Sequence, residues 1–176
     1  NLNPAGKEIL KSINNYFEEI REGDRKRVYI ETQGTMRVMN GIGQATLLTE
    51  LHQSRMQDWL IDSKFKPSTK AEYEKADVEL NETYKGVLEK NKSDFLEYIG
   101  IQEGRKDSVD RLKGDMKEIN AQTIRAQRAW IKYRDAWVAL VRSLQPQGNA
   151  STKDVINSVL TRLTVERIRE LSSEQN

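Results

Sequence analysis

The sequence contains no cysteine and a single histidine, His52, among its 176 residues. The absence of cysteine excludes thiol nucleophiles, disulfides and cysteine-ligated metals, and one histidine cannot form a His–His metal pair within the chain. No apolar run approaches the roughly 18 residues that a membrane-spanning helix needs, and the longest covers residues 136–141. We therefore expect no metal, no cofactor and no membrane span.

An excess of one charge is also missing, because 29 Lys and Arg residues stand against 27 Asp and Glu residues and leave a formal charge of +2. Proteins that bind nucleic acid concentrate basic residues, so nucleic acid is not expected as a partner. Acid–base catalysis needs a carboxyl group whose pKa is raised by an apolar pocket, whereas most carboxylates here lie beside Lys or Arg. We expect no enzymatic activity, and we expect His52 to lie on the surface or to pack.

Only three prolines interrupt the chain, Pro4, Pro67 and Pro146, and each stands where a helix could begin or has just ended. This spacing favours long helices. Asn3 as N-cap before Pro4 predicts the start of the first helix, and its apolar stripe continues to Gly23.

The stretch after Gly23 has no clear period. A strand over residues 28–30 would have nothing evident to pair with, so residues 24–41 are expected to be irregular or helical. Apolar residues from Leu47 to Leu60 then predict a second helix over about residues 43–63.

Helix signals are clearer after Pro67, where Thr69 with Glu72 fits a capping box. Apolar residues at steps of three and four predict helices over about 69–99 and 108–144, the second capped by Asp107 or Ser108. The glycines between them, Gly100 and Gly104, predict a break and hence an antiparallel helix hairpin.

The second helix of this hairpin carries another apolar stripe, Ile124, Ile131 and Val138, on a different face. A helix that is apolar on two sides needs two partners, and we assign the second to a C-terminal helix over about 152–172, capped by Ser151 with Asp154. The sequence thus predicts an all-α bundle of four to six helices.

Three segments stand out by their residue types, their order and their separations: ADVELNETY at 76–84, AQRAWIKYRDA at 126–136 and LTVERIREL at 163–171. Together they resemble the LprI-like lysozyme-inhibitor domain family over about residues 70–173. The resemblance divides the chain into an N-terminal helical extension of unrecognised type, residues 1–69, and an LprI-like helical domain, residues 70–176. The family-motif residues, which we expect to be structural, are Asp77, Leu80, Asn81, Tyr84, Gln127, Trp130, Tyr133, Arg134, Asp135, Thr164, Arg167 and Leu171.

The resemblance implies a non-enzymatic bacterial binding protein, periplasmic or secreted, that inhibits lysozyme or another peptidoglycan hydrolase. Its partner is then a protein. The chain begins at Asn1 without a methionine, so we expect that a signal peptide was removed, although the lack of cysteine leaves a cytoplasmic location open. Two other functions stay open: an immunity protein that neutralises an interbacterial toxin, and a structural or chaperone-like helical module of the envelope.

Many members of this family carry a pair of cysteines, one shortly after the Arg-Asp pair and one before the third segment. This chain has Val138 at the first position and Ser158 or Val159 near the second. The stabilisation that such a crosslink would add, about 2–4 kcal/mol, is therefore expected to come from packing.

Counting from the turn of the hairpin places Asp77 and Asn81 across from Gln127, Trp130 and Arg134. Buried polar groups persist when they are paired, so we expect a polar cluster beside the Trp130 ring. The hypothesis is that Arg134 pairs with Asp77 or with Asp135.

A locally basic stretch follows from residue 125 to residue 142. It is either a solvated helix face or a docking patch for an acidic partner. Animal-type lysozymes are strongly cationic, so an inhibitor is expected to present acidic complementarity, which this nearly neutral chain does not show. The residues of the possible patch are Arg125, Arg128, Lys132 and Arg142.

Overall fold

The computed structural model describes residues 2–31, 36–58, 67–101, 106–144 and 150–172. They contain no strand, so the all-α prediction is confirmed. The five helices are α1 (Pro4–Glu31), α2 (Met36–Met56), α3 (Lys70–Ile101), α4 (Lys106–Leu144) and α5 (Ala150–Ser172).

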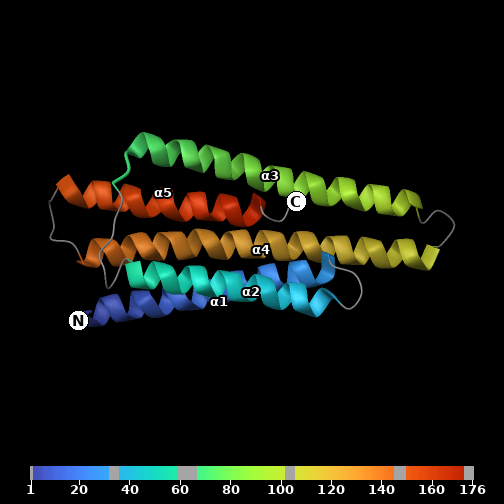
Figure 1. The fold of residues 1–176 in the computed structure, drawn as a ribbon, viewed down its shortest axis with the longest axis horizontal. Coiled ribbons are helices and arrows are strands. Elements are labelled where there is room, and N and C mark those ends of the chain that lie inside the picture. The colour runs from blue at the N-terminus through green and yellow to red at the C-terminus, as the bar shows by residue number, and fades with distance from the viewer. Residues whose placement is uncertain (1, 32–35, 59–66, 102–105, 145–149, 173–176) are drawn as a thin grey trace.

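Helix α4 is the central element of the bundle (Figure 1). It packs against α1 on one side and against α5 and α3 on the other, while α2 lies on α1 and α3 lies on α5. The expected antiparallel hairpin of α3 and α4 is present, but α5 lies between the first part of α3 and the last part of α4. The far ends of α3 and α4 extend past α1 and α2.

Two helix starts follow the sequence prediction. Asn3 Oδ1 accepts a hydrogen bond from the Gly6 N–H at 2.7 Å, as an N-cap does. Thr69 and Glu72 form a reciprocal capping box: the Thr69 N–H donates to Glu72 Oε2 at 2.6 Å, and the Glu72 N–H donates to Thr69 Oγ1 at 3.2 Å. Helix α3 is therefore held at the beginning of the motif-bearing part of the chain.

Two other predicted caps are wrong. Helix α4 begins at Lys106, so Asp107 and Ser108 lie inside its first turn. Helix α5 begins at Ala150, one residue before Ser151. Side chains that favour caps also favour the first turn of a helix, where their charge or hydroxyl group meets the free N–H groups, so composition alone does not separate the two positions.

Helix α1 does not end at Gly23 but continues to Glu31, and residues 24–31 are helical. Gly23 is buried against α4, because a Cβ atom placed on it would lie 3.1 Å from the Ala126 Cβ. The glycine therefore permits a close approach of two helices and does not act as a stop signal. Gly100 likewise lies inside α3 and does not end it, whereas Gly104 lies outside the described residues.

Helix α2 begins earlier than predicted, at Met36, and ends at Met56. Of the stretch over residues 24–41, the described part is therefore helical, within α1 and α2. The last part of the predicted helix over 43–63, including Leu60, lies outside the described residues beyond Asp58.

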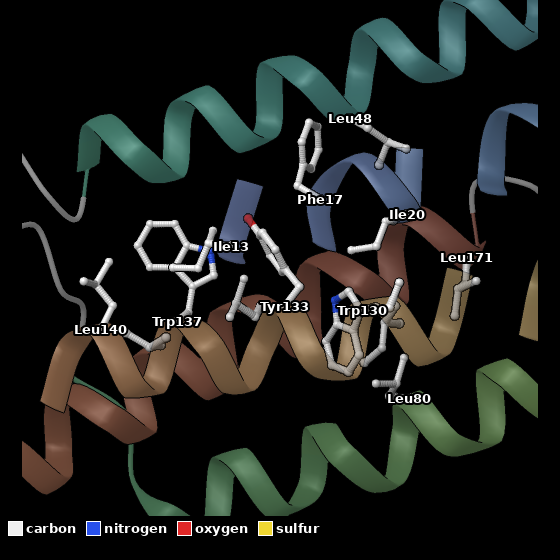
Figure 2. Close-up of a cluster of buried hydrophobic side chains, with 14 of the residues drawn as sticks. Ile13, Phe17, Ile20, Leu48, Leu80, Trp130, Tyr133, Trp137, Leu140 and Leu171 are labelled. Atoms are coloured by element: carbon white, nitrogen blue, oxygen red, sulfur yellow. The ribbon is translucent and has the colours of Figure 1, made fainter. Parts of the chain in front are cut away.

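The core is built around the aromatic residues of α4. Trp130, Tyr133 and Trp137 are all nearly inaccessible to solvent. Figure 2 shows the Tyr133 ring directed from α4 toward the side of Phe17, and Trp130 beside Leu80 of α3. Side chains of α1 and α2 belong to the same buried cluster as those of α3, α4 and α5, namely Ile13, Phe17, Ile20 and Leu48.

The second apolar stripe of α4, which was predicted to pack on α5, is buried only in part. Val138 is buried, but Ile124 and Ile131 are 37% and 41% exposed. The principal partner of α4 is α1. The face of α4 that α1 covers includes the small residue Ala126, which lies against Gly23. Hydrophobic periodicity cannot identify which of two apolar faces a neighbouring helix covers.

Candidate functional site

The side chain of Arg134 joins α4 to α3 beside the indole of Trp130. Its guanidinium lies 3.7 Å from Asp77 Oδ1 and donates to Asp135 Oδ1 at 2.9 Å. It also stands over the Trp130 ring, 5.5 Å from the ring centroid, which is within the range of a cation–π contact. The hypothesis that Arg134 pairs with Asp77 or Asp135 is confirmed for both carboxylates.

Of the two amides expected in this cluster, one is present. Asn81 donates to the Asp77 carbonyl one turn earlier in its own helix at 2.8 Å and lies 3.5 Å from Asp77 Oδ2. Gln127 accepts from the Nε–H of Arg167 on α5 at 3.3 Å. The expected cluster of carboxylate, amide and guanidinium is therefore present as Asp77, Asn81 and Arg134. The prediction is wrong for Gln127, because α5 takes this side chain.

A larger array of ion pairs lies between the N-terminal helices and α5, and we call it the charge network. Arg167 of α5 donates to Asp24 of α1 at 2.8 Å and to Glu170 at 3.1 Å. Arg55 of α2 donates to Glu170 at 3.1 Å and to Glu166 at 2.6 Å. The network links helices that are far apart in the sequence.

The network reaches the surface at its other end, where Arg162 donates to Glu166 at 2.9 Å and to Asp58 at 2.7 Å. Its inner members are almost fully buried, with side-chain exposure of 1% for Arg167, 4% for Arg55 and 5% for Glu170. Acids and bases alternate along the whole array. Each inner charge therefore has a partner of opposite sign, which is the condition under which charges persist in a protein interior.

His52 and Tyr133 extend this network toward α1. The Arg55 guanidinium lies 3.3 Å from the Tyr133 oxygen, His52 Nδ1 lies 3.0 Å from the same oxygen, and His52 Nε2 lies 3.1 Å from Asn14 Oδ1. Because Asn14 Oδ1 only accepts, Nε2–H is the donor there, and the Tyr133 hydroxyl then donates to Nδ1. His52 also stacks on Phe17 at 4.1 Å. His52 is thus a packing residue held as a neutral ring.

Burial, followed by the charge of Arg55, lowers the pKa of His52 from 6.5 to about 4. Between these values the unfolded chain binds a proton that the folded chain does not, so stability falls as the pH falls. The penalty is absent above about pH 6.5 and levels off below about pH 4, where it reaches about 3 kcal/mol.

We therefore predict that the free energy of unfolding falls more steeply between pH 7 and pH 4 in the native chain than in the His52→Gln variant. Urea titrations at several pH values, followed by circular dichroism, measure the difference. Equal pH dependence in the two proteins would contradict the assignment of a neutral, buried His52.

The basic residues predicted as a partner patch all lie on the solvent side of α4. Arg125, Arg128, Lys132 and Arg142 are exposed, and Ile124 and Ile131 share the same side of the helix. Lys132 Nζ stands 5.7 Å from the centroid of the Tyr16 ring on α1. The structure therefore brings Arg125, Arg128 and Lys132 together and leaves Arg142 in the last turn of α4.

Six of the twelve motif residues are buried, which decides how the motif is interpreted. Trp130, Tyr133 and Arg167 connect α4 and α5 to the core and to the charge network. Tyr84, Gln127, Arg134 and Asp77 are half-buried, and Asn81 and Asp135 are exposed. The fully buried members are Leu80, Trp130, Tyr133, Thr164, Arg167 and Leu171.

A family model described as "Lysozyme inhibitor LprI" matches residues 66–171, which takes in all of α3 and α4 and nearly all of α5. The chain belongs to the LprI family. The match begins three residues before the capping box of α3 and ends at Leu171, so the part of the chain that the LprI model covers excludes α1 and α2. No curated protein and no solved structure matches the chain.

Sequence reasoning missed the members of the charge network that lie outside the motif segments. Asp24, Arg55 and Asp58 come from residues that the LprI model does not cover. Charged residues make up 32% of the chain, so no single one stands out. The only local signal was the spacing of Arg162, Glu166 and Glu170 along one face of α5.

Among the described residues, no group of three or more His, Asp or Glu side chains is arranged to hold a metal ion. Within the same ranges no helix combines the length and the apolar character required to cross a membrane.

Proposed function

We propose that this protein inhibits lysozyme or a related peptidoglycan hydrolase by direct contact and without catalysis of its own. The observation that carries the proposal is the LprI family match, which extends over three complete or nearly complete helices of the bundle. The titratable groups that the fold gathers are engaged with one another, as Arg55 is with Glu166 and Glu170. The proposal assigns these groups to the stability of the bundle.

The proposed contact surface consists of exposed residues and excludes most of the motif. Motif residues such as Trp130 and Tyr133 are enclosed by other helices and cannot touch a partner in the folded chain. In this proposal the motif preserves the bundle, and the surface of the bundle recognises the hydrolase.

Because peptidoglycan lies outside the cytoplasmic membrane, the proposal places the protein in the periplasm or outside the cell. Fractionation of the producing cells tests this location, with recovery in the periplasm or medium expected. Recovery in the cytosol alone would contradict it.

Initial rates of lysis by an animal-type lysozyme test the inhibition. Addition of the chain at micromolar concentration should lower the rate in proportion to the amount added, with both a cell-wall substrate and a short soluble chitooligosaccharide. The soluble substrate is the control, because a protein that merely coated the wall would protect the wall alone. Unchanged rates at a tenfold molar excess would contradict the proposed function.

A further inference from the structure

The solvent face of α4 carries a run of cations and isoleucines, which we call the α4 strip. It consists of Ile124, Arg125, Arg128, Ile131 and Lys132, all exposed. These positions recur at steps of three and four residues, so they share one face of the helix. Residues 124–132 contain three cations and no carboxylate.

The cations of the strip differ from many others on this surface in having no acidic partner. Arg25 pairs with Glu22 at 2.9 Å and Lys90 pairs with Asp94 at 2.7 Å, each within its own helix. Within the described ranges, the structure gives Arg125, Arg128 and Lys132 no carboxylate at ion-pair distance. Their charges are therefore available to an external group.

Tyrosines border the strip on both neighbouring helices. Tyr16 of α1 lies under Lys132, and Tyr84 of α3 is close enough to Arg128 for this charge to oppose the rise of the Tyr84 pKa that burial causes. Both rings are half-buried. Arginine and tyrosine beside exposed aliphatic side chains are the composition typical of the energetically dominant part of protein interfaces.

We propose that the α4 strip is the surface that binds the hydrolase, and that Arg125, Arg128 and Lys132 face the carboxylates of its substrate cleft. This inference rests on the proposed function. Glycoside hydrolases cleave with two carboxyl groups about 5–9.5 Å apart. Cations three and four residues apart on a helix have Cβ atoms about 5–6 Å apart, so two neighbours on the strip match two carboxylates.

The basic charge of the strip is also compatible with a lysozyme that is itself cationic. A lysozyme that is cationic as a whole gains nothing over most of its surface from a partner of charge +2. Its substrate cleft is a local exception, because at least one catalytic carboxylate is ionised there. A compact basic strip is complementary to that site alone, and contact in a desolvated cleft strengthens the attraction.

Arg142 does not belong to this surface. It lies ten residues beyond Lys132 in the last turn of α4, about 15 Å along the helix axis. A cation at this position is stabilised by the negative end of the helix dipole, and this interaction is sufficient to explain the presence of Arg142. The proposed site is therefore narrower than the basic stretch of the sequence.

Two triple charge reversals on the full-length chain test the inference, with affinity for lysozyme and its inhibition as readouts. Both change the net charge from +2 to −4, since +2 − 6 = −4. Both replace exposed residues that have no carboxylate at ion-pair distance within the described ranges, and circular dichroism verifies that each variant folds. The strip variant is Arg125→Glu/Arg128→Glu/Lys132→Glu, and the control variant on α3 is Lys75→Glu/Lys85→Glu/Lys92→Glu.

We expect the strip variant to lose at least 100-fold in affinity, and the control variant to bind as well as the native chain or more tightly. The control separates the position of the charges from the net charge, because a charge of −4 on its own favours a cationic partner. If the native chain inhibits and the strip variant inhibits equally, the inference is overturned while the proposed function stands. If the native chain does not inhibit, the proposed function fails and the inference fails with it.

Discussion

Replacement of Arg167 by methionine should lower the free energy of unfolding by about 3–5 kcal/mol. Arg167 is 1% exposed and binds both Asp24 and Glu170. Methionine fills much of the same space but leaves Asp24 without this cation and Glu170 with Arg55 alone. An uncompensated charge in the interior costs more than the lost contact itself, because the charge cannot regain its hydration.

Urea denaturation followed by circular dichroism measures this loss. The matched control is Arg169→Met, which changes the same residue type two positions away on the exposed face of α5 and should alter stability by less than about 0.5 kcal/mol. A loss below about 1 kcal/mol in Arg167→Met would show that the charge network does not hold the bundle.

A chain that lacks α1 and α2, residues 59–176, should fail to fold cooperatively. Removal of these helices exposes Tyr133 and Trp137 and takes Asp24 and Arg55 from the charge network. The four apolar side chains that α1 and α2 bury contribute about 1.5–3 kcal/mol each, which together is comparable with the whole stability of a domain, about 5–15 kcal/mol. These side chains are Ile13, Phe17, Ile20 and Leu48.

The truncated chain is compared with the full-length protein by circular dichroism and urea denaturation. We expect reduced helicity and no sigmoidal transition, and partial recovery of both when a peptide of residues 1–58 is added. A cooperative transition in residues 59–176 alone would show that the LprI-matched part folds independently. The division into an extension and a domain at residue 69 stays a prediction until that experiment is done.

The helices of the second half could be predicted from sequence because their local and tertiary signals agree. The capping box of Thr69 and Glu72 and the apolar stripe through Leu80 give the same start and the same buried face of α3. The predicted end of α1 was wrong, because the glycine taken as the end of the helix serves helix packing instead. Glycine often ends a helix, but at position 23 its lack of a Cβ atom lets α1 approach Ala126 of α4 closely.

The partners of each helix could be predicted only in part. The periodicity of α4 indicates two apolar faces, and it cannot distinguish a face that another helix covers from one that is left at the surface. Ile131, assigned to a neighbouring helix, is exposed. The same ambiguity concealed the α4 strip, since exposed isoleucines within a basic face have the pattern of a buried stripe.

The charge network could not be predicted from sequence, because its members come from separate helices and ion pairing has no period. Arg55 and Glu170 are 115 residues apart, and each resembles an ordinary surface residue in a chain rich in both charges. Three motif residues belong to the network or contact it, Arg167, Tyr133 and Gln127, and they were recognised through the resemblance to the LprI family. Their partners on α1 and α2 became visible only in the folded chain.

Competition at the substrate cleft of lysozyme tests most directly whether the protein acts by blocking that cleft. Calorimetric titration of lysozyme with the full-length chain is repeated in the presence of a chitooligosaccharide that saturates the cleft. The account predicts that the apparent Kd rises in proportion to the oligosaccharide concentration, because only one of the two can occupy the cleft. An unchanged Kd, with chain and oligosaccharide bound to the same lysozyme molecule, would contradict it.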